Sequence, residues 1–335
     1  MNRGLILTLL LLLAVATVVI TPFLGMSTIS PLDALGLRDG GVGVDENTIF
    51  WRLRVPRVAL AFLAGASLAL GGMIFQALFR NDLATPFTLG VSSGAALGAT
   101  TYLRLGWSFA VLGLDGLTLF ALVGAVLSVF LVQGLSRSRI DASGSSLLLA
   151  GVAVNFTLSS MILFVHYTSD AAQSFNILRW LMGRLDVVGA EAVWTLAPLF
   201  VICGVGALIL HRELNLMTVG EEFAISRGVD SRRTRTLLFL GTSLLVGGVV
   251  AVCGPIGFVG MMTPHIARLL VGADHRRLAP ASMLMGGTML VLCDLLARTI
   301  VAPAEIPVGV VTALLGGPFF LWLLTRRHGH VVSRG

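Results

Sequence analysis

Residues 57–79 read Arg57-Val-Ala-Leu-Ala-Phe-Leu-Ala-Gly-Ala-Ser-Leu-Ala-Leu-Gly-Gly-Met-Ile-Phe-Gln-Ala-Leu-Phe79, an almost uninterrupted apolar run. The hydrocarbon core of a bilayer is about 30 Å thick, and a helix needs roughly 20 residues to cross it. The run therefore has the length of one membrane crossing. Its continuous apolar character also differs from the alternating pattern of an outer-membrane barrel strand.

Comparable runs occupy most of the chain, which has 335 residues, 12% of them charged, and a mean hydropathy of +0.93. An average soluble domain has roughly 25% charged residues. We therefore predict an all-α polytopic membrane protein with a single transmembrane domain over residues 1–335. The ten predicted spans are 4–24, 57–79, 89–104, 114–135, 145–166, 190–210, 234–253, 257–271, 279–298 and 307–324. The first run is longer than the apolar core of a signal peptide, which favours an uncleaved helix over a cleaved leader.

The basic residues number 23, and none of them is a lysine. A P-loop requires a lysine on the nucleotide phosphates, so this chain carries no Walker A site and cannot fuel transport alone. Most arginines fall in alternate loops, which by the positive-inside rule places both termini in the cytoplasm. The three cysteines lie far apart inside predicted spans and offer no metal-binding spacing.

One arginine cluster opposes this orientation rule. Arg52, Arg54 and Arg57 stand on the external side just before the second span, and Arg298 ends the ninth span on the same side. Arginines near helix ends can reach lipid headgroups, which is the ordinary explanation. Three of them in six residues on this side favour instead an acidic protein partner, because guanidinium groups bind carboxylates in a bidentate manner.

An internal repeat links the second and seventh spans. Gly65-Ala-Ser-Leu-Ala-Leu-Gly-Gly72 recurs as Gly241-Thr-Ser-Leu-Leu-Val-Gly-Gly248, and the two helices are predicted to run in opposite directions. Each copy is followed by a Gly/Pro-containing break and a short span. Small residues alone can reflect helix packing, but paired interrupted segments in inverted halves are typical of a transport path. We predict an inverted repeat that relates helices 2–5 to helices 7–10.

The longest predicted cytoplasmic loop covers residues 211–233. Thr218 and Glu221 have the spacing of a capping box, and Gly228 stands where a C-terminal cap is expected. The sequence therefore predicts one helix of two to three turns between them. So short a helix is marginal in water alone, which favours a cytosolic protein partner with a receiving groove over a plain linker turn.

Two other classes of protein fit the sequence less well. Gly90-Val-Ser-Ser-Gly94 matches the serine-hydrolase motif, but it lies at the start of a predicted membrane helix instead of a strand-to-helix elbow. An ion-coupled transporter would need ionisable groups inside its spans. Asp294 and Arg298 are four residues apart on one predicted helix and can neutralise each other.

Taken together, several motifs resemble the permease subunits of type II ABC importers for iron chelates, haem and cobalamin (the FecCD type). They are Arg54-Val-Pro-Arg57, Gln76-Ala-Leu-Phe-Arg-Asn81, Leu89-Gly-Val-Ser-Ser-Gly-Ala95, Leu148-Leu-Ala-Gly-Val152, Gly220-Glu-Glu222, Gly254-Pro-Ile-Gly-Phe-Val-Gly260, Pro264-His265, Asp294-Leu-Leu-Ala-Arg298 and Glu305-Ile-Pro-Val-Gly309.

The resemblance implies a homodimer, or a pair with a close paralogue, in a bacterial or archaeal cytoplasmic membrane. It implies two cytosolic ATPase subunits that carry ATP and Mg²⁺, an extracytoplasmic substrate-binding protein, and no cofactor, catalytic residue or metal site in this chain. Ferric siderophore is the first expected cargo, with haem and cobalamin as alternatives.

The resemblance also assigns residues to three roles. The residues expected to dock the binding protein are Arg54, Arg57 and Arg298. Those expected to contact the ATPase, on a coupling helix at about 218–229, are Gly220, Glu221, Glu222, Phe223, Arg227 and Gly228. Those expected at the cytoplasmic gate are Asn81, Asp82, Leu83, Gly144 and Ser145.

Two of the gate residues depart from the family pattern. Asp82 replaces the usual proline of Asn-Pro-Leu-Ala, which places an acid at the predicted gate. Gly144 stands where a well-known member has a hydroxyl residue.

Overall fold

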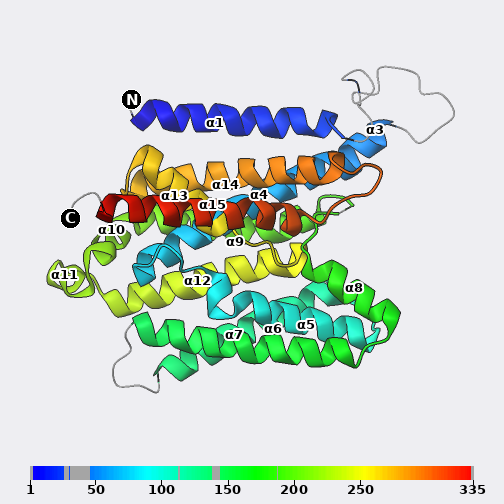
Figure 1. Cartoon of the computed structure of the whole chain (residues 1–335), viewed down its shortest axis with the longest axis horizontal. Coiled ribbons are helices and arrows are strands. Elements are labelled where there is room, and N and C mark those ends of the chain that lie inside the picture. Colours follow the sequence, from blue (N-terminus) through cyan, green and yellow to red (C-terminus); the bar gives the residue numbers. More distant parts are fainter. Residues whose placement is uncertain are drawn as a thin grey trace.

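A computed structural model describes residues 3–25, 30, 46–111, 114–137, 144–186 and 188–332. Its long helices lie side by side along one direction (Figure 1), and the ten predicted spans coincide with helices, which confirms the fold class. These helices are α1 (Arg3–Ile20), α4 (Val55–Phe79), α5 (Val91–Leu105), α6 (Gly116–Arg137), α7 (Gly144–Tyr167), α9 (Glu191–Ile209), α12 (Ser231–Cys253), α13 (Val259–Val271), α14 (His275–Thr299) and α15 (Val308–Val332).

Seven helical segments in the described part of the chain are long and apolar enough to cross a membrane by length and composition. The helix α13 and residues 308–323 of α15 are shorter apolar segments, and α5 has only 15 residues. The short helices α5 and α13 follow α4 and α12, as the predicted repeat requires. Figure 1 shows that α4 and α12 begin at opposite ends of the bundle.

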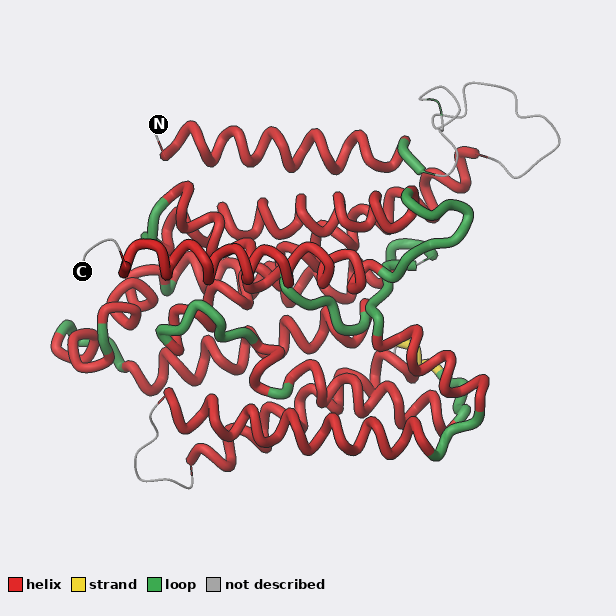
Figure 2. The backbone as a smooth tube through the Cα atoms, in the orientation of Figure 1, coloured by secondary structure: helices red, strands yellow, loops and turns green. Residues whose placement is uncertain are grey.

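Shorter elements connect the long helices. They are η1 (Thr21–Phe23), α3 (Glu46–Ile49), η2 (Phe50–Arg54), η3 (Pro86–Leu89), β1 (Ala110–Val111), β2 (Leu114–Asp115), α8 (Ala171–Leu181), α10 (His211–Val219) and α11 (Glu221–Ser226). The strands β1 and β2 pair in an antiparallel manner, with Ala110 opposite Asp115, and Figure 2 shows them at the same end of the bundle as α8. The sequence did not predict α8, although Asp170 and Gln173 form a reciprocal capping box at its start.

The second span starts earlier than predicted. α3, the π-helical turn η2 and α4 follow one another without a break, and Pro56 occupies the first turn of α4. Proline lacks an N–H donor and is tolerated in a first turn, where that donor would have no helical partner. Arg52, Arg54 and Arg57 therefore all stand on one continuous helical segment.

Helix α4 lies at the centre of the core, and its backbone approaches two neighbours closely. A Cβ atom on Gly65 would lie 2.2 Å from the carbonyl oxygen of Gly286 in α14. One on Gly72 would lie 1.5 Å from the carbonyl oxygen of Gly260 in α13. Only glycine permits these contacts, so α4, α13 and α14 pack main chain against main chain.

The two ends of the bundle carry different elements. One end holds α10 and α11, the start of α1 and the end of α15 (Figure 1). The opposite end holds α3 and α8 (Figure 1). We call these the α11 end and the α8 end.

Candidate functional site

At the α8 end, three helical segments and the connection between α14 and α15 bring arginines and acids together. The Arg57 guanidinium donates to Asp294 Oδ1 at 3.0 Å and to Glu305 Oε2 at 2.9 Å. Arg298 Nε lies 3.0 Å from the other oxygen of Asp294, which confirms the predicted pair within α14. Asp294 is fully buried, and burying a carboxyl group is costly unless it is paired, so Arg57 and Arg298 are its two counter-charges.

The remaining arginine contacts are hydrogen bonds to the main chain of the segment after α1. Arg54 donates to the Pro22 carbonyl oxygen at 3.1 Å, and Arg298 donates to that of Leu24 at 3.3 Å. We call Arg54, Arg57, Arg298, Asp294 and Glu305 the arginine cluster. With three positive and two negative side chains, it has a formal charge of +1.

A small polar hollow of about 60 Å³ adjoins the arginine cluster. Arg179 and Arg184 line it and lie 3.5 Å and 3.6 Å from the carboxylate of Asp186. These residues were not predicted from the sequence. They belong to no motif, and only the fold brings them beside Arg57.

At the α11 end, the helix predicted between Thr218 and Gly228 is present as α11, but it is shorter than predicted, and the helix α10 before it was not predicted. The chain forms two helices, α10 and α11, which meet at Gly220. Thr218 does not form a capping box, because it lies inside α10 and its hydroxyl donates to the Asn215 carbonyl oxygen at 2.7 Å. The cap at Gly228 is confirmed: its φ is +82°, and backbone bonds close both rings of a Schellman motif.

Side-chain contacts hold α10 and α11 against the bundle. Arg235 of α12 donates to Glu221 at 2.8 Å, so Glu221 faces α12. Asn215 of α10 donates to Asp274 at 2.9 Å and accepts the backbone N–H of His275 at 2.9 Å. The bond from Asn215 holds the pKa of Asp274 below its ordinary value, because it stabilises the carboxylate.

The outward surface of α11 is amphipathic. Glu222 is exposed, as are the apolar side chains of Phe223 and Ile225. Arg227 stacks over the ring of Phe223, with its guanidinium carbon 5.2 Å from the ring centre. Exposed apolar groups on a six-residue helix that projects from the bundle are suited to contact with another protein.

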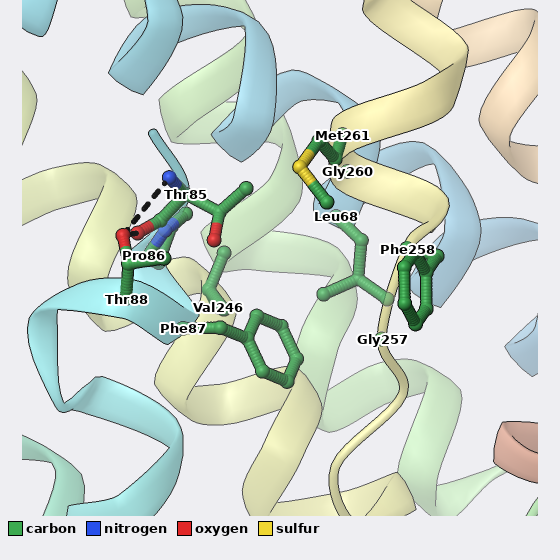
Figure 3. A pocket seen from close by; sticks show the side chains of 10 residues that line it. All are labelled: Leu68, Thr85, Pro86, Phe87, Thr88, Val246, Gly257, Phe258, Gly260 and Met261. Atoms are coloured by element: carbon green, nitrogen blue, oxygen red, sulfur yellow. Dashed lines mark hydrogen bonds between the residues drawn. The ribbon is translucent and has the colours of Figure 1, made fainter. Parts of the chain in front are cut away.

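Between the two ends, the two halves meet around an apolar cavity of about 220 Å³ (Figure 3). Leu68 lies in the first copy of the glycine repeat and Val246 in the second. The remaining lining residues come from the two breaks, at 85–88 and 257–261. The cavity thus lies where both copies of the inverted pattern converge.

The two breaks differ in backbone conformation. Thr85 and Thr88 exchange hydrogen bonds at the start of η3, and Gly90 then adopts a φ of +82° before α5. The second break contains Gly254, with a φ of +71°, and Phe258, with a φ of +67°. Left-handed φ values are uncommon for a bulky residue, so Phe258 is held by its surroundings.

Three of the predicted gate residues lie beside this region. Asn81 Oδ1 accepts the Leu83 N–H at 2.9 Å and forms a tight turn after α4. Asp82 accepts a hydrogen bond from Arg268 of α13 at 2.6 Å, and the same arginine donates to Gln76 at 3.1 Å. We call this the Asp82–Arg268 contact. Sequence reasoning singled out the acid but missed its partner.

The other two gate residues, Gly144 and Ser145, form the first turn of α7. Their side-chain environment lies outside the described part of the structure. The hydrolase motif, residues 90–94, follows the 3-10 turn η3 and opens α5. It therefore has no strand-to-helix elbow, the context that a serine nucleophile requires.

Comparison with known proteins identifies the class. The model of the FecCD transport family matches residues 9–326. The chain is 40% identical to the hemin transport system permease protein HmuU of Yersinia pestis, and the match covers 83% of this chain and 84% of that protein. It is also 40% identical to the vitamin B12 import system permease protein BtuC of Klebsiella pneumoniae, with 83% of each chain covered.

A solved structure agrees over nearly the whole chain. It is described as an inward-facing conformation of a metal-chelate type ABC transporter. The two structures superpose with a TM-score of 0.85 and share 32% sequence identity, and the match covers 96% of this chain and 99% of that chain. The protein belongs to the FecCD transport family. It is a membrane-embedded permease subunit of an ABC importer, a class that works with ATPase and substrate-binding partners.

Proposed function

We propose that this permease imports a metal chelate of the ferric-siderophore type along a path between two copies of itself or a copy and a close paralogue. The observation that supports this class of cargo is the structural similarity, over 96% of the chain, to a metal-chelate type transporter. Haem and cobalamin are the alternative cargoes, because relatives at 40% identity are named for hemin and vitamin B12. Uptake of ferric siderophore, haem and cobalamin into vesicles that hold the full complex distinguishes the three.

The arginine cluster is the proposed landing site for the binding protein. A carboxylate from that protein would compete with Glu305 for Arg57, and Glu305 is partly exposed and can be displaced. Arg54 and Arg298 hold the segment after α1 in place beside it. Because Arg57 is already oriented by Asp294, docking would require little side-chain ordering.

A charge-reversal experiment tests the docking. The double variant Arg54→Glu/Arg57→Glu should lose stimulation of ATPase by the binding protein while basal ATPase remains. The matched control is Arg104→Glu, because Arg104 is exposed at the α8 end on α5 and outside the cluster. Full stimulation in the double variant would rule out the docking site.

Helix α11 is the proposed contact for the cytosolic ATPase, which would hold ATP and Mg²⁺. Glu222, Phe223 and Arg227 point away from the bundle contacts, and Gly220 and Gly228 delimit the helix. Glu221 has the different task of fastening α11 to Arg235. The α11 end, with both chain termini, then faces the cytoplasm of a bacterial or archaeal cell.

A photo-crosslinking amino acid tests this contact. Placed at Glu222 in the assembled complex, it should crosslink to the ATPase subunit. Placed at Glu191, which is exposed at the start of α9, it should not. An assembled complex that gives no crosslink from Glu222 would exclude α11 as the contact.

Residues 81–83 are proposed to form part of the cytoplasmic gate together with Gly144 and Ser145. The Asp82–Arg268 contact joins the break after α4 to α13, so it spans the two halves beside the central cavity. An ion-coupled mechanism has less support, because the buried Asp294 is paired with both Arg57 and Arg298. Uptake by the purified chain alone in liposomes, driven by a proton gradient, would overturn the ATP-driven scheme.

A further inference from the structure

Helices α6 and α12 leave an apolar groove between them that the transport scheme does not use. The groove encloses about 210 Å³. It is lined by Leu122, Ala125, Val126, Val129 and Phe130 of α6 and by Leu240, Ser243, Leu244 and Gly247 of α12. Ser243 is the one hydroxyl residue among them, and its buried Oγ has no hydrogen-bond partner in the described part of the structure. Apart from the Ser243 hydroxyl, the lining of the groove is apolar.

The lining residues form one face on each helix, with spacings of three and four residues. The floor lies where Gly247 meets Ala125, since a Cβ atom on Gly247 would be 2.9 Å from the Ala125 methyl group. Phe130 and Leu244 border the groove and are 59% and 39% exposed. The groove thus opens on the outer surface of a membrane protein, where its natural occupant is an acyl chain.

A positive charge stands in line with the groove. Arg233, Leu240 and Gly247 are spaced by seven residues along α12 and so lie on nearly the same side of the helix. Two turns, about 10 Å, separate Arg233 from the groove. Arg232 and Arg233 are exposed at the α11 end. The nearby Asp230 offsets one of these charges and Arg235 is paired with Glu221, so the first turn of α12 retains a net positive charge.

We propose that the α6–α12 groove binds one acyl chain of an anionic glycerophospholipid whose phosphate is held by Arg233 and Arg232. The lipid would lie in the leaflet at the α11 end, with its chain parallel to α12. Basic side chains beside a groove between membrane helices favour anionic headgroups, and guanidinium groups bind phosphate oxygens in a bidentate manner. This site depends only on the chain being embedded in a bilayer.

Native mass spectrometry of the purified full chain tests the site with two probes. These are phosphatidylglycerol and phosphatidylcholine with identical acyl chains. We expect one phosphatidylglycerol to be retained per chain in preference to phosphatidylcholine. Arg233→Gln should weaken that retention about fivefold, as expected for one basic group near an anionic lipid. The matched control, Arg277→Gln, removes an exposed arginine from α14 at the same end and should change nothing.

A second pair of variants tests the groove itself. Leu240→Trp should fill it and remove the preference for phosphatidylglycerol, whereas Leu208→Trp, on the exposed face of α9, should not. If Leu240→Trp is not monodisperse, Val126→Phe fills the groove from the other wall. Equal retention of both lipids, or retention unchanged by groove filling, would overturn the proposal. Loss of a dimer on groove filling would also overturn it, because a second copy would then be the occupant.

Discussion

The two copies of the glycine repeat are identical at five of eight positions, but they pack differently. In α4, Gly65 and Gly72 touch the main chain of α14 and α13. In α12, a Cβ atom on Gly241 would lie 3.7 Å from Cys203 Sγ, and one on Gly248 would lie 3.1 Å from a methyl group of Leu199. The repeated glycines give both helices a face without side chains. How closely another helix approaches that face depends on the residues of the other helix.

The halves also differ in charge. Helix α14 buries Asp294 and Arg298, whereas α6, its counterpart in the first half, has no ionisable residue between Gly116 and Leu135. The second half therefore supplies both members of the Asp294–Arg298 pair, whereas α6 of the first half supplies one of the two walls of the apolar groove. The two halves share the order of long and short helices, but the corresponding helices differ in the chemistry of their faces.

The largest expected effect comes from adding a methyl group to each repeat glycine. Gly72→Ala should destabilise the protein by at least about 3 kcal/mol, because the new methyl group overlaps the Gly260 carbonyl. The cost should fall in the order Gly72, Gly65, Gly248 and Gly241. Gly241→Ala should lie within about 0.5 kcal/mol of the parent.

The measurement is thermal unfolding in one detergent, together with the yield of monodisperse protein. Gly241→Ala serves as the control, since it makes the same chemical change at the equivalent site. Equal costs at Gly65 and Gly241 would show that the two copies pack alike and would remove the contrast.

The next effect concerns the buried acid that only the second half carries. Asp294→Asn should cost about 3 kcal/mol, because it leaves Arg298 buried without its counter-charge. Glu305→Gln, at the partly exposed member of the same cluster, should cost less than about 1 kcal/mol. Denaturation midpoints of the two variants give the comparison, and a smaller loss for Asp294→Asn than for Glu305→Gln would contradict it.

A smaller effect is expected where the halves meet. A double-mutant cycle on Asp82→Asn and Arg268→Gln should give a coupling of about 0.5–1 kcal/mol, since both side chains are partly exposed. The exchanged pair Asp82→Arg/Arg268→Asp should recover part of the stability that each reversal alone removes. Strict additivity in the cycle would mean that the two groups do not interact in solution.

The smallest effect is a dependence on pH at the α11 end. The pKa of Asp274 is lowered from 3.8, chiefly by the Asn215 hydrogen bond, so the carboxylate stabilises the fold above pH 3.8 and ceases to do so as the pH falls through the lowered value. Asn215→Leu removes that cause and should flatten the loss of stability below pH 3.8. Melting temperatures measured in nanodiscs between pH 3 and pH 5 test this, with Thr218→Val as a control in the same helix.

The sequence was informative wherever a property is local. The apolar run at 57–79 and its repeat predicted membrane helices in their observed places, and Gly228 predicted a helix end. Local signals also existed for the missed helix α8, in Asp170 and Gln173. The boundary at Gly220 was missed because Thr218 has a cap-like spacing to Glu221, while the preceding turn keeps it helical.

Long-range partners were not accessible from one sequence. Asp82 and Arg268 are separated by 186 positions, and no pattern in either segment points to the other. The same holds for Arg57, whose acids lie 237 and 248 positions away. Such pairs follow from the packing of α4 between α13 and α14, which the glycine positions permit but do not specify.

The glycine contacts of α4 have a mechanical consequence. Where two main chains touch, no side chain lies between them that could change its rotamer. The helices therefore cannot shift gradually against each other by repacking side chains. Helices α4, α13 and α14 should then behave as one stiff frame. Any rearrangement during a transport cycle must be taken up by elements outside it, such as α15 and the breaks at residues 81–90 and 254–258.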